Sequence, residues 1–399
     1  MSNIPKLRFP EFTDAWEKCK LGEIATINPK STLPQTFNYV DLESVVGTEM
    51  RSYKIEKLYS APSRAQRLAK YGDIFYQTVR PYQKNNYLFE LDDENYVFST
   101  GYAQIRSKIY PYFLFTLIQN DRFVNEVLDN CTGTSYPAIN AIDLKNITIF
   151  ISNNPTEQQK IGNLFKQLDR LITLHKRKWD DVILLKKALL QKMFPKNGSD
   201  FPEIRFPEFT DAWEKCKLVE VAEIVGGGTP DTNNANYWDG DIDWYSPTEI
   251  GEDIYVSGSL KKISQLGLER SSAKLLPEHR TILFTSRASI GDMAILLKSG
   301  TTNQGFQSFV VNEKKANVYF LYSLGFKIKN FALKNATGST FLEISKKQLE
   351  KMEIPFPTLP EQQKIGALFR RLDRLITLHK RQHEHYQLLK KALLQQMFV

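Results

Sequence analysis

The chain has 399 residues, of which 42% are hydrophobic, 25% charged and 12% aromatic, a composition that excludes a disordered or collagen-like protein. No stretch reaches the roughly 18 apolar residues of a membrane-spanning helix, and the amino terminus lacks the apolar segment of a secretion signal. The net charge of +8 and three scattered cysteines predict a cytoplasmic protein with reduced thiols and a polyanionic partner.

A motif near the amino terminus reveals an internal duplication. Residues 8–21 read RFPEFTDAWEKCKL, and residues 205–218 repeat these letters without a change. Residues 157–177 (EQQKIGNLFKQLDRLITLHKR) return at 361–381 with three differences. Such self-similarity predicts two copies of one structural plan, a pseudo-two-fold repeat.

The first variable segment follows this motif and has no close copy in the other half. Short apolar runs between turn residues predict strands at 74–79, 96–98 and 146–151, with helix near 110–128. The expected class is therefore α+β. Residues 25–154 carry thirteen basic and thirteen acidic residues, so any contact with nucleic acid requires the cations to gather on one face.

A local basic island lies in this neutral segment between residues 64 and 87, which include one acidic residue. Arg and Lys can pair with guanine edges or phosphates, and Gln or Asn with adenine. A set of ordinary polar loops is the alternative. The candidate contacts are Arg64, Arg67, Gln77, Arg80, Tyr82, Gln83, Lys84, Asn86, Thr134 and Ser135.

Residues 155–196 and 359–399 are predicted to form long helices. Apolar residues recur at steps of three and four, as in coiled-coil seams. Thr156 with Gln159, and Thr358 with Glu361, fit capping boxes at the two starts. At ~1.5 Å per residue each helix is a rod of roughly 50 Å, and an antiparallel pair would hold the variable domains at a fixed spacing. The seam residues are Ile161, Phe165, Leu168, Ile172, Trp179, Ile365, Phe369, Leu372, Ile376 and Tyr386.

The two predicted helices carry the charge excess, with ten basic against four acidic residues in the first and eight against three in the second. These cations suit a solvated face, a partner subunit or DNA phosphate. His175 and His379 on the seam are interpreted as polar insertions that fix helix register. A metal site formed by His379, His383 and His385 is the weaker alternative.

The second half starts after a linker at 197–204 and is expected to repeat the order of elements with a different amino-acid sequence. Strands are expected at 281–285, 309–311 and 352–354, with helix near 318–333. Thr337 to Thr340 echo Thr132 to Ser135 of the first half. The candidate contacts here are Ser272, Lys274, Ser286, Arg287, Asn303, Gln304, Ser339 and Thr340.

Sequence motifs of catalysis and cofactor binding are missing. The sequence contains no phosphate loop, dinucleotide fingerprint or nucleophile elbow. Residues 226–230, GGGTP, lack the lysine of a phosphate loop and are interpreted as a tight turn. We therefore expect a non-catalytic chain without a metal or cofactor of its own.

The order of these motifs resembles the specificity subunit of Type I restriction-modification enzymes. The pattern is RFPEF, a tryptophan, a variable domain and the EQQKIG helix with LDRLI, all present twice, and the second domain adds SRASIG and TNQGF. The resemblance implies two target-recognition domains, each of which reads one half of a bipartite, asymmetric site in double-stranded DNA, and two helices that dock two modification subunits. It implies S-adenosylmethionine and ATP on the modification and restriction subunits, and the domain order 1–154, 155–196, 197–204, 205–358 and 359–399.

Three alternatives stay open. The chain could be the specificity subunit of a related restriction-modification type with fused or different partners. It could be an enzyme with its own methyltransferase or nuclease site, which the missing motifs oppose. A coiled-coil adaptor without DNA reading would explain the helices but would leave the divergence of the two domains unexplained.

Overall fold

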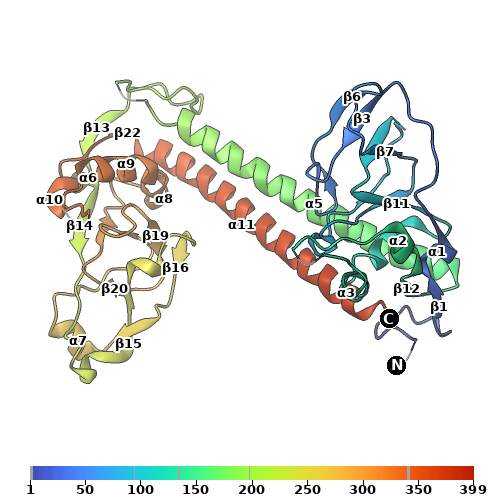
Figure 1. The fold of residues 1–399 in the computed structure, drawn as a ribbon. Helices are drawn as coiled ribbons and strands as arrows, with labels where there is room; N and C mark the ends of the chain where they lie inside the picture. Colours follow the sequence, from blue (N-terminus) through green and yellow to red (C-terminus); the bar gives the residue numbers. More distant parts are fainter. Residues whose placement is uncertain (1–2, 94, 134, 197, 339–341) are drawn as a thin grey trace. The chain divides into compact units, whose positions relative to one another are not determined.

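The computed structural model describes residues 3–93, 95–133, 135–196, 198–338 and 342–399. The chain divides into two compact units, Met1–Arg177 with Lys380–Val399, and Lys178–His379. Each unit therefore contains one variable domain, part of the long helix α5 (Pro155–Lys192) and part of the long helix α11 (Leu359–Gln396) (Figure 1).

The first unit contains two four-stranded sheets, in the orders β6-β3-β10-β7 and β2-β11-β8-β9. Its motif strand β1 pairs antiparallel with β12, the strand that directly precedes α5. The strands are β1 (Glu17–Lys20), β2 (Ala25–Ile27), β3 (Thr36–Val40), β4 (Val45–Val46), β5 (Glu49–Met50), β6 (Lys54–Lys57), β7 (Ala65–Leu68), β8 (Asp73–Gln77), β9 (Tyr87–Leu88), β10 (Tyr96–Ser99), β11 (Tyr102–Ser107) and β12 (Thr148–Ile151). The short helices are α1 (Leu21–Ile24), α2 (Pro111–Leu117), α3 (Asp121–Asp129), α4 (Ala141–Asn146) and the 3₁₀ helix η1 (Pro81–Gln83).

The second unit has a five-stranded sheet, β14-β21-β18-β19-β16, and a three-stranded sheet, β17-β15-β20. Here too the motif strand β13 pairs antiparallel with the strand before the long helix, β22. The strands are β13 (Glu214–Lys217), β14 (Ala222–Gly226), β15 (Trp238–Tyr245), β16 (Tyr255–Val256), β17 (Lys261–Ile263), β18 (Thr281–Phe284), β19 (Met293–Leu296), β20 (Gly300–Thr302), β21 (Gln307–Val311) and β22 (Glu353–Phe356). The short helices are α6 (Leu218–Val221), α7 (Gln265–Glu269), α8 (Val318–Ser323), α9 (Gly325–Asn335), α10 (Lys346–Leu349) and the 3₁₀ helices η2 (Ala235–Tyr237) and η3 (Pro247–Glu249).

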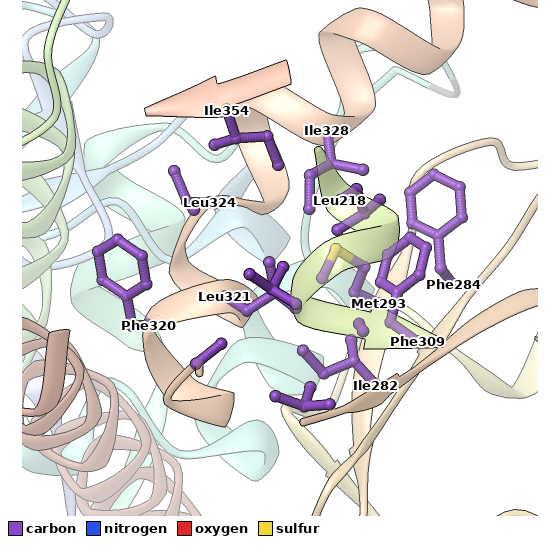
Figure 2. Packing of buried hydrophobic residues seen from close by; sticks show 14 of the residues in the cluster. Leu218, Ile282, Phe284, Met293, Phe309, Phe320, Leu321, Leu324, Ile328 and Ile354 are labelled. Carbon is purple, nitrogen blue, oxygen red and sulfur yellow. The ribbon is translucent and has the colours of Figure 1, made fainter. Parts of the chain in front are cut away.

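The core of each unit joins its sheet to both long helices. In the second unit, Leu321 and Leu324 of the α8 region pack with Phe284 and Phe309 of the sheet (Figure 2). The same cluster includes Phe369 of α11, together with Met193 and Phe194 at the end of α5. In the first unit the roles are exchanged, with Phe165 of α5 packed beside Met397 and Phe398 after α11. The repeated Met-Phe pair thus ends each helix in the core of the opposite domain.

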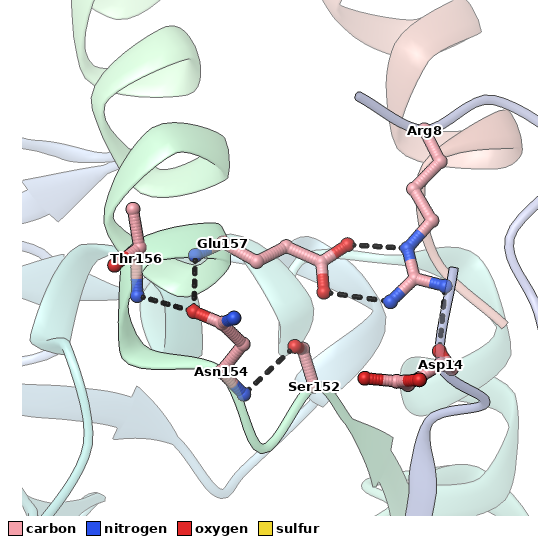
Figure 3. A network of polar contacts seen from close by, with 6 residues as sticks. All are labelled: Arg8, Asp14, Ser152, Asn154, Thr156 and Glu157. Atoms are coloured by element: carbon pink, nitrogen blue, oxygen red, sulfur yellow. Dashed lines mark hydrogen bonds and ion pairs between the residues drawn. The ribbon is translucent and has the colours of Figure 1, made fainter. Parts of the chain in front are cut away.

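A buried ion pair explains why the RFPEF motif is repeated. Nε and Nη2 of Arg8 donate to the two carboxylate oxygens of Glu157, at 2.6 and 2.8 Å, and Glu157 is fully buried (Figure 3). Arg205 makes the same bidentate contact with Glu361, at 2.8 Å for both bonds. The motif therefore fastens each domain to the first turn of the helix that follows it.

The predicted capping box at Thr156 is wrong. Oδ1 of Asn154 accepts hydrogen bonds from the backbone N–H groups of Thr156 (2.9 Å) and Glu157 (3.3 Å), so Asn154 caps α5. Thr156 lies inside the first turn because the helix begins one residue earlier, at Pro155. Glu361 likewise gives both carboxylate oxygens to Arg205 instead of serving a capping box.

The two long helices run antiparallel within each unit. In the first unit the ring of His175 on α5 stacks on Tyr386 of α11, with centroids 5.5 Å apart. Further along this pair, Lys390 meets Asp169 at 2.5 Å. Increasing numbers on one helix thus meet decreasing numbers on the other.

The predicted seam residues fall into two groups. Six are buried in domain cores, and these are Ile161, Phe165, Leu168, Ile365, Phe369 and Leu372. Four are half-buried along the helices, and these are Ile172, Trp179, Ile376 and Tyr386. The apolar stripe therefore serves the domain at the start of each helix and then runs on along the helix.

The α+β class with two antiparallel long helices and an internal repeat is confirmed. Cys19, Cys131 and Cys216 are free and partly buried. Among the helices that the structure describes, none combines the length and apolar character needed to cross a bilayer.

Candidate nucleic-acid interface

In the first unit, the basic island gathers where strand β8 ends. The chain turns there through Arg80, whose φ of 55° is left-handed, into η1, and leaves η1 through Lys84 with the same φ. Non-glycine residues pay a conformational cost in this region, and such residues cluster at functional sites. The residues on both sides of η1 thus have an energetically unfavourable backbone conformation.

Arg80 is the best-positioned candidate of this loop. Its backbone N–H donates to the carbonyl of Pro137 at 2.8 Å, and its guanidinium carbon lies 4.2 Å from the ring centre of Tyr136. Arg80 is half-buried, and Nε is buried without a hydrogen-bond partner. The cation–π contact orients the planar guanidinium, so its outer N–H groups are available to an acceptor such as a guanine edge.

Three other candidates of the island are occupied inside the protein. Gln77 is 3% exposed, and its Nε2 donates to Val79 O (2.7 Å) and to Oε1 of Gln83 (2.9 Å). Asn86 is fully buried and accepts from the N–H of Gln77 at 2.7 Å. Nζ of Lys84 donates to the carboxylate of Asp121 at 2.5 Å. These side chains shape the loop, while Tyr82 and Gln83 are exposed on it.

Arg64 and Arg67 lie on a different sheet but next to the same loop. Arg64 is exposed directly before β7, and its carbonyl accepts from the N–H of Thr100 at 2.8 Å. The next residue, Gly101, accepts from the N–H of Thr78 at 2.9 Å. A single turn therefore connects the two parts of the island. Arg67 is half-buried, and burial lowers the pKa of its guanidinium.

The second unit builds an equivalent loop from different side chains. Ile139 N donates to Thr78 O at 3.0 Å, and in the second unit Ile344 N donates to Ser286 O at 2.9 Å. The left-handed residue two positions after Thr78 is Arg80, and two positions after Ser286 it is Ala288, with φ of 62°. The two loops thus follow the same backbone path but place their arginines differently. Arg80 is itself the left-handed residue, whereas Arg287 directly precedes the left-handed Ala288.

The remaining candidates of the second unit converge on this loop. Ser286 N donates to the carbonyl of Gly305 at 2.8 Å, which brings Asn303 and Gln304 beside Arg287. The hydroxyl of Thr229 donates to Oε1 of Gln304. Ser286 itself is fully buried, whereas Arg287 and Asn303 are half-buried and Gln304 is exposed.

The GGGTP turn closes this cluster from the other side. Gly228 N donates to Thr302 O at 2.8 Å, and its carbonyl accepts from Nε1 of Trp244 at 2.9 Å. A Cβ on Gly228 would collide with Ser272, so only glycine fits between the two segments. Ser272 and Lys274 are exposed on the neighbouring segment. The turn predicted from the sequence is therefore a packing device within the loop cluster.

Three candidates, Thr134, Ser339 and Thr340, lie outside the described residues, whereas Ser135 is exposed. Two residues of the clusters were missed by sequence reasoning. Tyr136 is 64% exposed, and an exposed aromatic in a polar loop was the available signal. Thr229 was assigned to a turn, and its contact with Gln304 links segments that are far apart in the sequence.

Over the same described ranges, no group of three His, Cys, Asp or Glu residues has the geometry of a metal site. His379, His383 and His385 therefore do not form such a group.

Comparison with known proteins gives one family for both halves of the chain. The model of the Type I restriction modification DNA specificity domain matches residues 13–184 and again residues 210–385. The Type I restriction enzyme MjaIX specificity subunit of Methanocaldococcus jannaschii is 34% identical over 204 residues, which cover 50% of this chain and 47% of that protein.

A second relative extends over more of the chain. The Type I restriction enzyme HindI specificity subunit of Haemophilus influenzae is 22% identical over 416 residues, covering 86% of this chain and 90% of that protein. The chain thus spans about half of the MjaIX relative and nearly all of the HindI relative. A crystal structure of a Type I restriction-modification S subunit from M. genitalium shares the fold, with a TM-score of 0.64, 16% identity and 99% coverage of both chains.

Proposed function

Because the chain belongs to the Type I restriction-modification DNA specificity family, we propose that each of its variable domains reads one half of a bipartite, asymmetric DNA site. The observation that carries this proposal is the pair of loop clusters. They stand at the same backbone position in the two units but present different side chains. Two different readers on one plan suit two different half-sites.

Arg80 and Arg287 are the proposed base-reading residues. Each is half-buried, and its side chain extends from a loop that is fixed by several backbone hydrogen bonds. A guanidinium held in this way suits bidentate bonding to guanine in the major groove. Arg64, Lys274, Gln83 and Gln304 are exposed around them and would contact phosphates or neighbouring base edges.

The long helices are the proposed docking sites for two copies of one modification subunit. They expose the same leucines twice: Leu184 is 64% exposed and its counterpart Leu388 is 68% exposed. Leu174 and Leu378 form a second such pair, at 43% and 46%. Exposed leucines at equivalent positions of the two helices suit identical partners.

In this proposal the chain is a non-catalytic cytoplasmic subunit. The modification subunits would bind S-adenosylmethionine and methylate the DNA, and the restriction subunits would use ATP for translocation and cleavage. This chain would supply the sequence reading and the assembly surface, with no cofactor of its own.

Selection from random duplex DNA tests the proposal. The full chain, assembled with its modification subunits, is incubated with a pool of randomised duplexes, and the retained duplexes are sequenced. We expect enrichment of two short, unlike sequences at a constant separation. Retention of duplexes without an enriched sequence, or no retention, would contradict the reading function and favour a coiled-coil adaptor.

A further inference from the structure

Two of the three differences between the repeated helix segments fall at positions that face the variable domains. Within 157–177 and 361–381 the helices differ at Asn163/Ala367, Lys166/Arg370 and Gln167/Arg371. The first two pairs lie on the side of each helix that meets its own domain, as the contacts below show. These positions therefore differ where the domains differ.

Helix residues that are the same in both copies bind features that both domains share. Oε1 of Gln158 accepts from the backbone N–H of Tyr110 at 3.3 Å, and Oε1 of Gln362 accepts from the backbone N–H of Asn317 at 3.0 Å. Since a backbone N–H is present whatever the side chain, this contact tolerates divergence. The Arg8–Glu157 pair and its repeat behave in the same way.

A triad of side chains that occurs in both units also joins each domain to the helices. The hydroxyl of Tyr112 donates to Oδ2 of Asp169 at 2.8 Å, and Nζ of Lys390 donates to Oδ1 at 2.5 Å. One carboxylate thus joins the domain, its own helix and the opposite helix. The second unit repeats this arrangement with Tyr319, Asp373 and Lys186.

The first unit adds contacts that have no copy in the helix repeat. The hydroxyl of Tyr110 donates to Oδ1 of Asn163 at 2.7 Å. Nζ of Lys166 donates to Glu90 at 2.6 Å and lies 5.7 Å from the ring centre of Tyr112. The Tyr110 ring also covers Gly162, where an added Cβ would lie 2.5 Å from it.

The second unit has different side chains at these contact positions. Asn317 stands in place of Tyr110, and the helix residue facing it is Ala367 instead of asparagine. A cavity of about 510 Å³ lies at this place, and its lining includes Asn317, Ala367, Arg370 and Tyr255. Burial raises the pKa of Tyr255, while the adjacent Arg370 guanidinium acts in the opposite direction.

We propose that helix positions 163 and 166, and their counterparts 367 and 370, determine which recognition domain each helix accepts. The shared contacts attach either domain, and the unlike contacts match one domain to one helix. These four are positioning residues, and the inference concerns the assembly of the chain whether or not the domains read DNA.

A double-mutant cycle tests the first match. Tyr110→Phe removes the hydroxyl, Asn163→Ala removes its acceptor, and the double variant removes both. We expect each single variant to lower the thermal midpoint of the full chain, and the double variant to lower it no further than the more harmful single one. Additive shifts in the double variant would overturn the proposed pairing.

Exchange of the two domains tests the whole inference. In the exchanged chain, segments 22–154 and 219–358 change places, while the motifs and helices stay. We expect a lower thermal midpoint than in the parent. Adding Asn163→Ala, Lys166→Arg, Ala367→Asn and Arg370→Lys to the exchanged chain should recover much of this loss, whereas the same four changes should destabilise the parent.

Equal effects of the four substitutions on both chains, or no effect on either, would overturn the proposal. The thermal midpoint is measured without DNA, so this outcome is independent of the proposed reading function. A chain that assembled as expected but failed to select a DNA sequence would instead count against the function alone.

Discussion

At the scale of single residues, buried polar contacts define where each domain begins and ends. Glu157 and Glu361 are fully buried carboxylates, and each is compensated by one bidentate arginine. Burying an unpaired charge is expensive, so removing one partner costs more than removing both. The repeated motif is retained in both halves because its partner in the helix is retained.

Arg8→Met should therefore destabilise the first unit by ~3–5 kcal/mol, because it leaves the Glu157 carboxylate buried and unpaired. The free energy of unfolding by urea measures this change. The double variant Arg8→Met with Glu157→Met is the matched control and should regain much of the loss. A single variant as stable as the parent would show that the pair contributes little.

The cysteines give a pH-dependent prediction. Burial, assisted by nearby glutamates, raises the pKa of Cys19 and of Cys216 to about 11 in each case. A raised thiol pKa means that the neutral form persists as the pH rises, and the thiolate is the reactive form. At pH 8 the thiolate fraction is on the order of one in a thousand, against roughly a quarter for an ordinary thiol with a pKa near 8.5.

Alkylation of Cys19 and Cys216 in the folded chain should therefore be slow at pH 8 and should accelerate about tenfold per pH unit up to pH 10. Mass spectrometry of the alkylated peptides measures both rates, with the urea-unfolded chain as the control. Labelling of the folded chain at the rate of the unfolded chain at pH 8 would be inconsistent with buried thiols.

At the scale of elements, each long helix combines a stretch buried in a domain core with a stretch that exposes leucines. The start of each helix is buried in a domain core, through Phe165 in one and Phe369 in the other. Later residues expose the same leucines in both copies. The same apolar composition thus serves folding at one end and, in the proposed complex, association along the rest.

Leu184→Asp and Leu388→Asp should each remove one modification subunit, because a carboxylate cannot be buried against an apolar partner surface without a large cost. Native mass spectrometry of the assembled complex should show one bound copy for each single variant and none for the double variant. Ile55→Asp, at an apolar position of the first domain that is 74% exposed, is the control. Two copies bound to the double variant would rule out this docking surface.

Sequence periodicity predicted the long helices well, but it could not identify their partners. The first helix was expected at 155–196 and spans Pro155–Lys192, because an apolar stripe at steps of three and four specifies a helix locally. The same stripe indicates which side of the helix is buried, but it does not indicate which part of the chain packs against that side. That Ile161 and Phe165 enter the domain core depends on contacts made far along the chain.

The candidate site was predictable in location but not in detail. The polar segments that the sequence singles out lie on loops that meet within each unit. Polar letters alone do not tell a buried amide from an exposed one, so Gln77 and Asn86 could not be separated from Gln83. The stacking of Arg80 on Tyr136 depends on a strand–loop pairing across more than fifty residues, beyond the reach of local patterns.

At the scale of the whole molecule, duplication followed by divergence accounts for the difference between the repeated motifs and helices and the unlike variable domains. The RFPEF motifs and the helix segments 157–177 and 361–381 remain nearly identical, whereas the loop clusters differ in side chains. The central segments are electrically neutral, so in the proposed function the affinity for DNA would depend on local groups of cations and on partner subunits. In the proposed function, the loops determine the sequence preference and the helices determine the assembly.

Methylation-site sequencing of cells that express the chain with its modification subunits tests this division most directly. The parent should modify a bipartite site, Arg80→Ala should relax one half of it by ~1–3 kcal/mol of discrimination, and Arg287→Ala should relax the other half. Arg122→Ala, an exposed arginine on α3 of the first domain, should leave both halves unchanged. Relaxation of the same half by both loop variants, or of neither half, would contradict the account.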